Sequence, residues 1–320
     1  MERGTDIQKA AAILRDGGLV AFPTETVYGL GANGLNPVAV ARIFEVKQRP
    51  AFDPLILHVG SPGQASGLFL YPDDNRIKVL TERFWPGPLT IVAPRKPIVP
   101  DIVTSGMPTV AVRMPSHPVA LQLIRAAGVP VAAPSANLFG RLSPTLPHHV
   151  QKQLTGVDYL LDGGKTQIGV ESTIISLAGE TATLLRPGFI TLEQIREIIP
   201  VMMANATDAE DQPLAPGLLK SHYSPEKPLT VFETLEHDPG SRAGVIYLSP
   251  DPSHDSLKAR TIHLSASGDL VEAAAHLFTA LHEMENDPEV DEIYIQKVEE
   301  KGIGIAIMDR VRKAAYRHVK

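Results

Sequence analysis

The hydrophobic positions along the first 200 residues form short apolar runs separated by amphipathic stretches. Apolar runs bounded by Gly or Pro predict strands, at residues 19–22, 55–59, 89–93, 109–113, 129–133, 159–161, 172–177 and 183–185. Helical periodicity with cap residues predicts helices, at residues 6–16, 37–46, 63–70, 75–84, 118–127 and 192–199. Because the two kinds of element mix without strict alternation, we expect an α/β fold with a large twisted mixed sheet and flanking helices.

The pattern changes twice after residue 200. Residues 201–228 are rich in Met, Ala, Asn, Asp and Pro and have no clear period, so they predict a linker after a large domain at 1–200. Residues 229–320 return to short apolar runs and helical stretches. They predict strands at 229–232, 243–248, 261–264 and 292–295 and helices at 270–284 and 305–316, which together indicate a small βα-repeating, Rossmann-like domain.

Composition narrows the class of protein. The chain has 320 residues, 43% hydrophobic and 21% charged, which is ordinary for a globular protein with a sizeable core. The lack of cysteine excludes disulfides, thiolate catalysis and zinc–thiolate sites. Its apolar runs are all shorter than the roughly 20 residues of a membrane span, and residues 1–18 resemble a helix more than a signal peptide. We therefore expect a cytoplasmic protein with no membrane partner.

Charge is distributed unevenly along the chain. Residues 229–320 contain 10 Lys+Arg and 16 Asp+Glu, which leaves 20 of each for residues 1–228 from the totals of 30 and 36. A neutral large domain argues against a broad basic face for nucleic acid. Cations there would matter where the fold gathers them into one cleft.

Residues 19–58 gather the most candidate chemistry. A predicted strand ends in a hydroxyl-rich turn at 23–26, and a predicted loop with three glycines follows. A helix capped by Asn36 then delivers Lys47 and Arg49. The next strand contains His58. Hydroxyls, backbone N–H groups and two cations suit a polyphosphate. The alternatives are cations that only complement the helix dipole and a histidine satisfied in the core.

The glycines of this stretch match the spacing of a dinucleotide fingerprint, Gly29-x-Gly31-x-x-Gly34. That fingerprint requires its first glycine directly after the strand, with an acidic residue about 20 residues on. Here six residues, 23–28, intervene, and Asp53 precedes its strand. We therefore reject a dinucleotide site.

Other polar residues also follow predicted strands. Arg113 suits a carboxylate clamp or, about equally well, a structural ion pair. Ser135 and Asn137 follow a strand of small residues, and Arg186 ends another. The histidines form no metal-binding pair, and no two acids form an evident acid–base couple. Hydroxyls and arginines at strand ends favour electrostatic stabilisation of a transferred phosphate over a covalent nucleophile.

Taken in order, the motifs resemble the threonylcarbamoyl-AMP synthase family in its long form, with a YrdC-like domain and a C-terminal domain. The matching motifs are PTETVYGLG at 23–31, KQR at 47–49, DPLILH at 53–58, FWPGPLT at 84–90, TVAVRMP at 109–115, APSAN at 133–137, GVESTII at 169–175, LLRPG at 184–188 and SHYSP at 221–225. The resemblance covers nearly all of residues 5–228. The last 90 or so residues fit the family's C-terminal domain by position and βα pattern.

The resemblance implies a reaction and its participants. L-Threonine, bicarbonate or CO2, and ATP would give threonylcarbamoyl-adenylate and pyrophosphate, assisted by Mg2+. The product would serve the first step of threonylcarbamoyladenosine modification of tRNA, and a threonylcarbamoyl transferase complex would receive it. Transfer RNA would then be only an indirect partner, in agreement with the neutral large domain.

The resemblance also implies residue roles, position by position. Threonine binding falls to Thr26, His58, Arg113, Ala133 and Thr173. ATP binding falls to Arg49, Asp53, Thr109, Ser135, Asn137, Ser143, Arg186, Tyr223 and Ser224. Lys47, Arg49 and Arg113 would act in catalysis. Asp53 stands where the family often has Asn, which adds a negative charge near the phosphates unless Mg2+ lies beside it. The linker motif at 216–225 would cover the site as a lid.

Two other interpretations remain open from the sequence. A related carbamoyl-adenylate-forming protein of hydrogenase maturation would be expected to carry acylphosphatase-like and zinc-finger regions, which a chain without cysteine does not support. An RNA-binding or ribosome-assembly module could use the same cationic cavity. Strong, salt-dependent RNA affinity would distinguish it.

Overall fold

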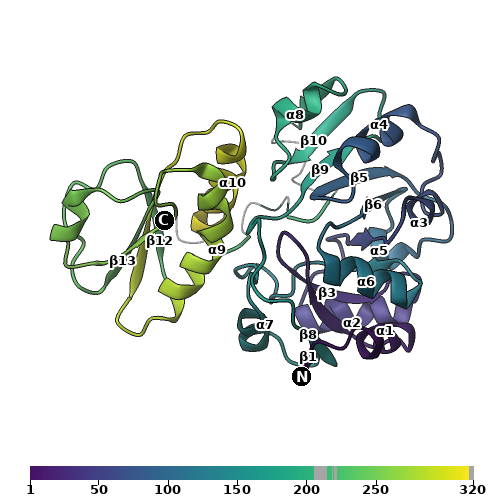
Figure 1. Ribbon diagram of the computed structural model, residues 1–320, viewed down its shortest axis with the longest axis horizontal. Coiled ribbons are helices and arrows are strands. Elements are labelled where there is room, and N and C mark those ends of the chain that lie inside the picture. Colours follow the sequence, from purple (N-terminus) through teal and green to yellow (C-terminus); the bar gives the residue numbers. More distant parts are fainter. Residues whose placement is uncertain (205–214, 218, 220–221, 317–320) are drawn as a thin grey trace.

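Two α/β domains lie side by side in the computed structural model, which describes residues 1–204, 215–217, 219 and 222–316 (Figure 1). The larger domain is built on an eleven-stranded mixed sheet in the order β1-β8-β2-β3-β7-β4-β6-β5-β9-β10-β11. Its strands are β1 (Glu2–Gly4), β2 (Val20–Pro23), β3 (Tyr28–Asn33), β4 (Ile56–His58), β5 (Leu89–Pro94), β6 (Thr109–Arg113), β7 (Val131–Ala132), β8 (Tyr159–Leu161), β9 (Thr173–Ser176), β10 (Ala182–Arg186) and β11 (Val201–Met203). The predicted large mixed sheet is confirmed.

Eight helices flank the described part of this sheet, and their caps follow the sequence signals. The helices are α1 (Ile7–Arg15), α2 (Pro37–Lys47), α3 (Pro62–Ser66), α4 (Asn75–Phe84), α5 (Asp101–Thr104), α6 (Pro118–Ala127), α7 (Pro147–Gln153) and α8 (Leu192–Arg196). In α2 the Asn36 side chain accepts from the N–H groups of Val38 and Ala39, as the Asn-Pro signal predicts. Helix α6 ends at Gly128 in the left-handed conformation, which glycine adopts readily.

The smaller domain has four parallel strands in the order β12-β15-β13-β14. They are β12 (Leu229–Phe232), β13 (Ala243–Tyr247), β14 (Arg260–His263) and β15 (Glu292–Gln296), with a 3-10 helix at Pro252–Ser256. Helices α9 (Leu270–Asn286) and α10 (Ile303–Ala315) lie between this sheet and the larger domain (Figure 1). Parallel strands joined through helices confirm the predicted Rossmann-like βα pattern.

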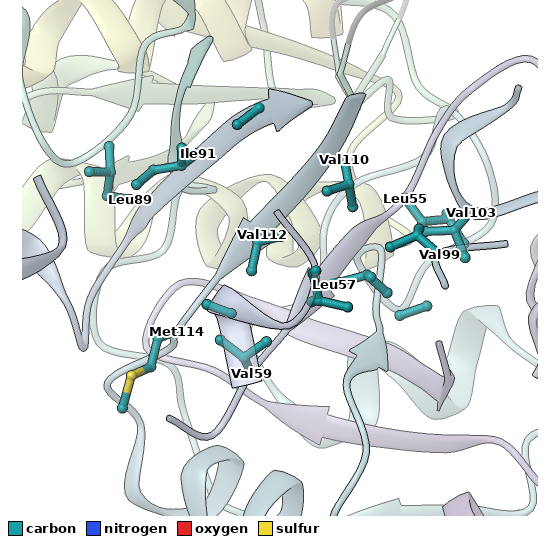
Figure 2. Close-up of a cluster of buried hydrophobic side chains, with 14 of the residues drawn as sticks. Leu55, Leu57, Val59, Leu89, Ile91, Val99, Val103, Val110, Val112 and Met114 are labelled. Carbon is teal, nitrogen blue, oxygen red and sulfur yellow. The ribbon is translucent and has the colours of Figure 1, made fainter. Parts of the chain in front are cut away.

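Alternate side chains of the central strands point into one core. Leu57, Val110, Val112, Leu89 and Ile91 lie on one face of β4, β6 and β5, as Figure 2 shows. The register pairs Leu57 and Ile91 with Val112 across the three strands. Because successive side chains of a strand point to opposite faces, the residues between them face the other side of the sheet.

The glycine-rich segment after the first turn is a buried strand, β3, and not the loop that the sequence suggested. A Cβ at Gly31 would lie 2.8 Å from the Phe22 ring and 2.9 Å from the Val131 side chain. These glycines therefore allow large side chains of the neighbouring strands to pack over β3. They do not form an anion-binding loop.

The remaining differences from the sequence prediction concern short elements. Strands β1 and β11, helices α5 and α7 and the small 3-10 helix were not predicted. They have three to seven residues, too few for a period to stand out. Strand β11 begins in the segment predicted to be a linker and pairs in parallel with β10. Residues 205–214, 218, 220 and 221 of that segment lie outside the described residues.

The two domains meet through helix α9. Gly169 has a φ of +77°, and a Cβ there would lie 2.4 Å from the Ala274 carbonyl oxygen. Beside it, the Thr145 and Thr279 hydroxyls lie 3.0 Å apart. The rings of His149 and His282 stack with centroids 3.8 Å apart. Nε2 of His282 donates to the Ser143 carbonyl at 3.1 Å, so this histidine contacts the larger domain directly.

The histidine pair predicts that acid weakens the folded protein. Burial lowers the pKa of His282 to about 4, whereas its ordinary value is 6.5. Below pH 6.5 the unfolded chain therefore binds a proton that the folded protein refuses, and stability rises with pH. The stability that neutral His282 contributes is fully present above pH 6.5 and is lost as the pH falls through about 4. At about pH 5 we expect the free energy of unfolding to have fallen by about 2 kcal/mol through this group.

Urea unfolding at about pH 7.5 and about pH 5 measures this effect. Wild type should lose more stability on acidification than His282→Gln, which has no ring to protonate. His237 is exposed, so His237→Gln is the matched control and should behave as wild type. An equal loss in wild type and His282→Gln would contradict the interpretation.

Candidate functional site

A cavity with about 500 Å3 of empty space opens on the face of the sheet opposite the core of Figure 2. Register places His58 beside Arg113, and Arg113 beside Thr90, one residue beyond the core-facing positions. The cavity therefore collects the residues at the ends of β2, β4, β6, β7 and β10. The described residues Pro216, Gly217, His222 and Tyr223 of the linker form part of its wall. Strands β2 and β7 run opposite to β4, β6 and β10, so side chains of distant segments reach the cavity from both strand directions.

Arg113 stands at one end of the cavity and is 3% exposed. Its Nη1 donates to Thr26 Oγ1 at 3.0 Å, its Nε donates to the Gly87 carbonyl at 3.3 Å, and its Nη2 lies 2.7 Å from Glu25 Oε1. The Arg113 guanidinium holds the pKa of Glu25 below its ordinary value against the opposing effect of burial. Arg113 therefore forms a structural ion pair and also lines the cavity, and its role as a carboxylate clamp stays a prediction.

His58 adds a neutral ring to the same end. Burial, reinforced by the nearby Arg113 charge, lowers the pKa of His58 to about 3. Its Nδ1 has no hydrogen-bond partner among the described residues, and the Phe22 ring packs against its edge. Thr24 and Thr26 lie close by with their hydroxyl oxygens 2.8 Å apart. This end therefore offers one guanidinium, hydroxyls and an uncharged imidazole, which suit a small amino acid.

Arginines gather along the rest of the wall. Arg186 binds the Ser172 carbonyl through Nε and Nη2, at 3.1 and 2.9 Å, and the Pro216 carbonyl through Nη1 at 3.0 Å. Arg49 pairs with Asp53 at 2.8 Å, and both side chains are almost fully buried. Burial lowers the pKa of Arg49 and of Arg186 because no water screens their charges. An anionic ligand would offset that cost.

Lys47 lies behind this wall and supports the loop that follows β7. Its Nζ donates to the Ser135 carbonyl at 2.5 Å and to the Asn137 carbonyl. Burial lowers the pKa of Lys47 well below its ordinary value, and the Arg49 charge acts in the same direction. Asp53 opposes that shift. The lysine thus fixes the backbone beside Ser135, and a direct contact of Lys47 with phosphate stays a prediction.

Eight of the predicted site residues line the cavity: Thr26, Arg49, His58, Arg113, Ala133, Ser135, Arg186 and Tyr223. Six others are buried behind its described wall: Lys47, Asp53, Asn137, Ser143, Thr173 and Ser224. Thr109 is half-buried at the opposite end of β6, about 13 Å along the strand from Arg113. The structure thus brings most of the predicted set to one place and separates Thr109 from it.

Two of the buried residues differ most from expectation. Thr173 is fully buried, and its hydroxyl donates to the Ile190 carbonyl at 2.6 Å. The adjacent Ser172 lines the cavity instead, since neighbours on a strand point to opposite faces. Asp53 is ion-paired with Arg49, so the negative charge introduced at this position is compensated within the protein.

Sequence reasoning missed four groups at the cavity. Thr24, Ser172 and His222 belong to recognised motifs but received no role. Glu171 also lines the cavity, and it is paired with Arg310 of the smaller domain at 2.9 Å. The segment order of the chain gives no sign of that contact. Its only local signal is an arginine on the apolar face of a predicted helix.

The described residues contain neither a cluster of metal ligands nor a membrane-spanning helix. No group of three or more His, Asp or Glu side chains there could hold a metal ion. Glu25, Asp53 and Glu171, the acids nearest the cavity, each have an arginine partner. Among the described helices, none combines the length and apolar character needed to cross a membrane.

Fold and cavity together define a two-domain α/β protein with buried cations around a hydroxyl-lined cavity, suited to a small anionic ligand. Residues 12–188 match the Sua5_yciO_yrdC family, described as telomere recombination, and residues 190–316 match the threonylcarbamoyl-AMP synthase C-terminal domain. The chain belongs to the threonylcarbamoyl-AMP synthase family, and the resemblance found in the sequence is confirmed.

Individual relatives match the chain along most of its length. A threonylcarbamoyl-AMP synthase of Pyrococcus abyssi is 44% identical over 337 residues, covering 98% of this chain and 95% of its own. One of Bacillus subtilis is 43% identical over 326 residues, covering 97% and 92%. The crystal structure of P. abyssi Sua5 complexed with L-threonine matches with a TM-score of 0.88 and 41% identity, covering 99% of this chain and 97% of that one.

Proposed function

We propose that this chain is an ATP-dependent L-threonylcarbamoyladenylate synthase, a nucleotidyltransferase acting in threonylcarbamoyladenosine modification of tRNA. The observation that carries the proposal is a single cavity that joins an amino-acid-sized end at Arg113, Thr26 and His58 to a cationic wall at Arg49 and Arg186. The related P. abyssi Sua5 was crystallised with L-threonine, which fits the first end. The cationic wall suits a triphosphate.

The reaction proposed for this cavity needs no covalent enzyme intermediate. The threonine amine attacks CO2, itself free or formed from bicarbonate, and a C–N bond forms as the amine loses a proton. A carbamate oxygen then attacks the α-phosphorus of ATP, and pyrophosphate leaves with the electrons of the broken P–O bond. The protein supplies position and charge: Arg113 for the threonine carboxylate, and Arg49 and Arg186 for the phosphates.

Mg2+ fits this proposal as part of the nucleotide substrate. The three acids nearest the cavity are already ion-paired, so the described part of the chain offers no dedicated carboxylate cage. Mg2+ commonly keeps its waters and binds substrate phosphates with few protein ligands. We propose that ATP enters as its Mg2+ complex, with the ion neutralising phosphate charge that the buried arginines do not reach.

Release of pyrophosphate from ATP tests the function directly. It should require both bicarbonate and L-threonine, and L-serine, which lacks the threonine methyl, should support much less. Omission of each substrate in turn is the control, and the adenylate product should form in equal amount to pyrophosphate. Absence of release with every amino acid would reject the synthase, and RNA titration against salt would then test the binding-module interpretation.

A further inference from the structure

Arg310 belongs to the smaller domain but is buried in the wall of the larger one. It lies on α10 and is 0% exposed. Its Nε donates to Glu171 Oε2 at 2.9 Å, and its Nη1 donates to the Pro187 carbonyl at 2.8 Å and to Asp309 Oδ2 at 2.7 Å. A buried guanidinium is costly unless it is paired and hydrogen-bonded, so these contacts fix its position closely.

Glu171 transmits this contact to the cavity. It lines the cavity, and its other carboxylate oxygen accepts from the Ser143 hydroxyl at 2.5 Å. One carboxylate thus connects helix α10 with the segment between β7 and α7. Removal of the arginine would leave that carboxylate buried without its nearest opposite charge, which is strongly unfavourable.

The same face of α10 also holds described residues of the linker. The Arg310 guanidinium lies 5.6 Å from the centre of the Tyr223 ring. Lys313, one turn further along, donates to the Gly217 carbonyl at 2.8 Å and pairs with Asp309. Tyr223 and Gly217 line the cavity beside Arg186. Helix α10 therefore contacts the wall through Glu171 and through the linker.

We propose that Arg310 is a positioning residue of the active site, through which docking of the C-terminal domain sets the nucleotide-facing wall at Glu171, Tyr223 and Arg186. It acts through other residues and is not among those that line the cavity. The assay by which it is tested rests on the proposed function. The contacts themselves do not depend on that function.

Removal of Arg310 should also change the pH dependence of activity. Burial raises the pKa of Glu171, but the charges of Arg310 and Arg186 and the Ser143 hydroxyl together hold it below its ordinary value. Tyr223, Asp309 and Lys313 also belong to this cluster of titratable groups. Without Arg310 the effect of burial should dominate, and the Glu171 carboxyl should take up a proton at a higher pH. Activity should then fall on acidification sooner than in wild type.

The test compares Arg310→Met and Arg310→Lys with two matched controls. Arg312→Met removes an arginine of the same helix that is exposed and paired with Glu300. Thr279→Val removes a hydroxyl contact of the same domain interface that does not involve Glu171. For each protein we would measure pyrophosphate release against ATP, threonine and pH, together with urea unfolding.

Arg310→Met should raise KM for ATP by about tenfold or more while changing KM for threonine by less than about threefold. Its acid limb should move upward by about one pH unit or more. Arg310→Lys keeps the charge, but its ammonium group cannot donate to both Glu171 and the Pro187 carbonyl as the guanidinium does. It should therefore return the acid limb of the pH profile to its wild-type position and recover only part of the ATP affinity. Arg312→Met should match wild type. If Arg310→Met does not fold, the KM split in Arg310→Lys carries the test.

Equal kinetics in Arg310→Met and Arg312→Met would overturn the proposal. So would the same ATP-specific loss in Thr279→Val, because that substitution leaves the Arg310–Glu171 contact in place and the loss would then not depend on Arg310. If wild type released no pyrophosphate, the proposed function would be what failed. Calorimetric ATP binding to the same five proteins would then decide on Arg310, with unchanged affinity in both of its variants counting against it.

Discussion

Arg113→Met should weaken L-threonine binding by about 2–5 kcal/mol, roughly 1.5 to 3.5 orders of magnitude in KM. The substitution removes the guanidinium at the amino-acid end of the cavity and frees Glu25, which lies 2.7 Å from it. The unpaired, buried Glu25 carboxylate would then repel the carboxylate of threonine. KM for ATP should change little, because Arg49 and Arg186 remain in place.

The measurement is pyrophosphate release with threonine and ATP varied separately. Arg95→Met is the control, since Arg95 binds the Val99 and Met107 carbonyls outside the cavity and should affect neither KM. The double variant Glu25→Gln with Arg113→Met should recover part of the threonine affinity, because it removes the repelling charge. Equal losses for threonine and ATP would reject the role proposed for Arg113.

Chemistry at strand ends was the part of the site that the sequence could predict. Thr26, His58, Arg113 and Arg186 all follow or end apolar runs, and the sheet brings these strand-end side chains to one cavity. Local pattern was sufficient because each residue is positioned by its own strand. The fold class followed from the same runs and from the helix caps.

The failures arose where neighbours distant in sequence decide the outcome. The glycines of β3 suggested a loop, but Gly31 is required because the Phe22 and Val131 side chains of neighbouring strands pack over it. A motif match could not tell whether Ser172 or Thr173 faces the cavity, because that depends on the orientation of the strand. Arg310 lies 139 residues from Glu171, and only docking of the domains brings them together.

We expect Gly169→Ala to disrupt the interface between the two domains more than any other substitution. A side chain at a φ of +77° costs about 1–2 kcal/mol for any L residue. Here the added Cβ would also lie 2.4 Å from the Ala274 carbonyl oxygen and 2.6 Å from the Ala275 Cα, both in the backbone of α9. Helix backbone cannot move aside as a flexible side chain can, so forced separation should add about 1–3 kcal/mol.

Gly164→Ala isolates the cost of the close approach. Gly164 also has a φ of +77°, but no atom of the described residues lies within 4 Å of the Cβ that would be added. Gly164→Ala should therefore lose only the conformational part of the free energy. Urea unfolding would measure both losses, and hydrogen exchange in α9 and α10 would show whether the helices leave the larger domain. If Arg310 positions the cavity, Gly169→Ala should also raise KM for ATP, whereas Gly164→Ala should not. Equal destabilisation by the two substitutions would show that α9 yields to the side chain, and that the domains are less tightly docked than the contacts at Gly169 require.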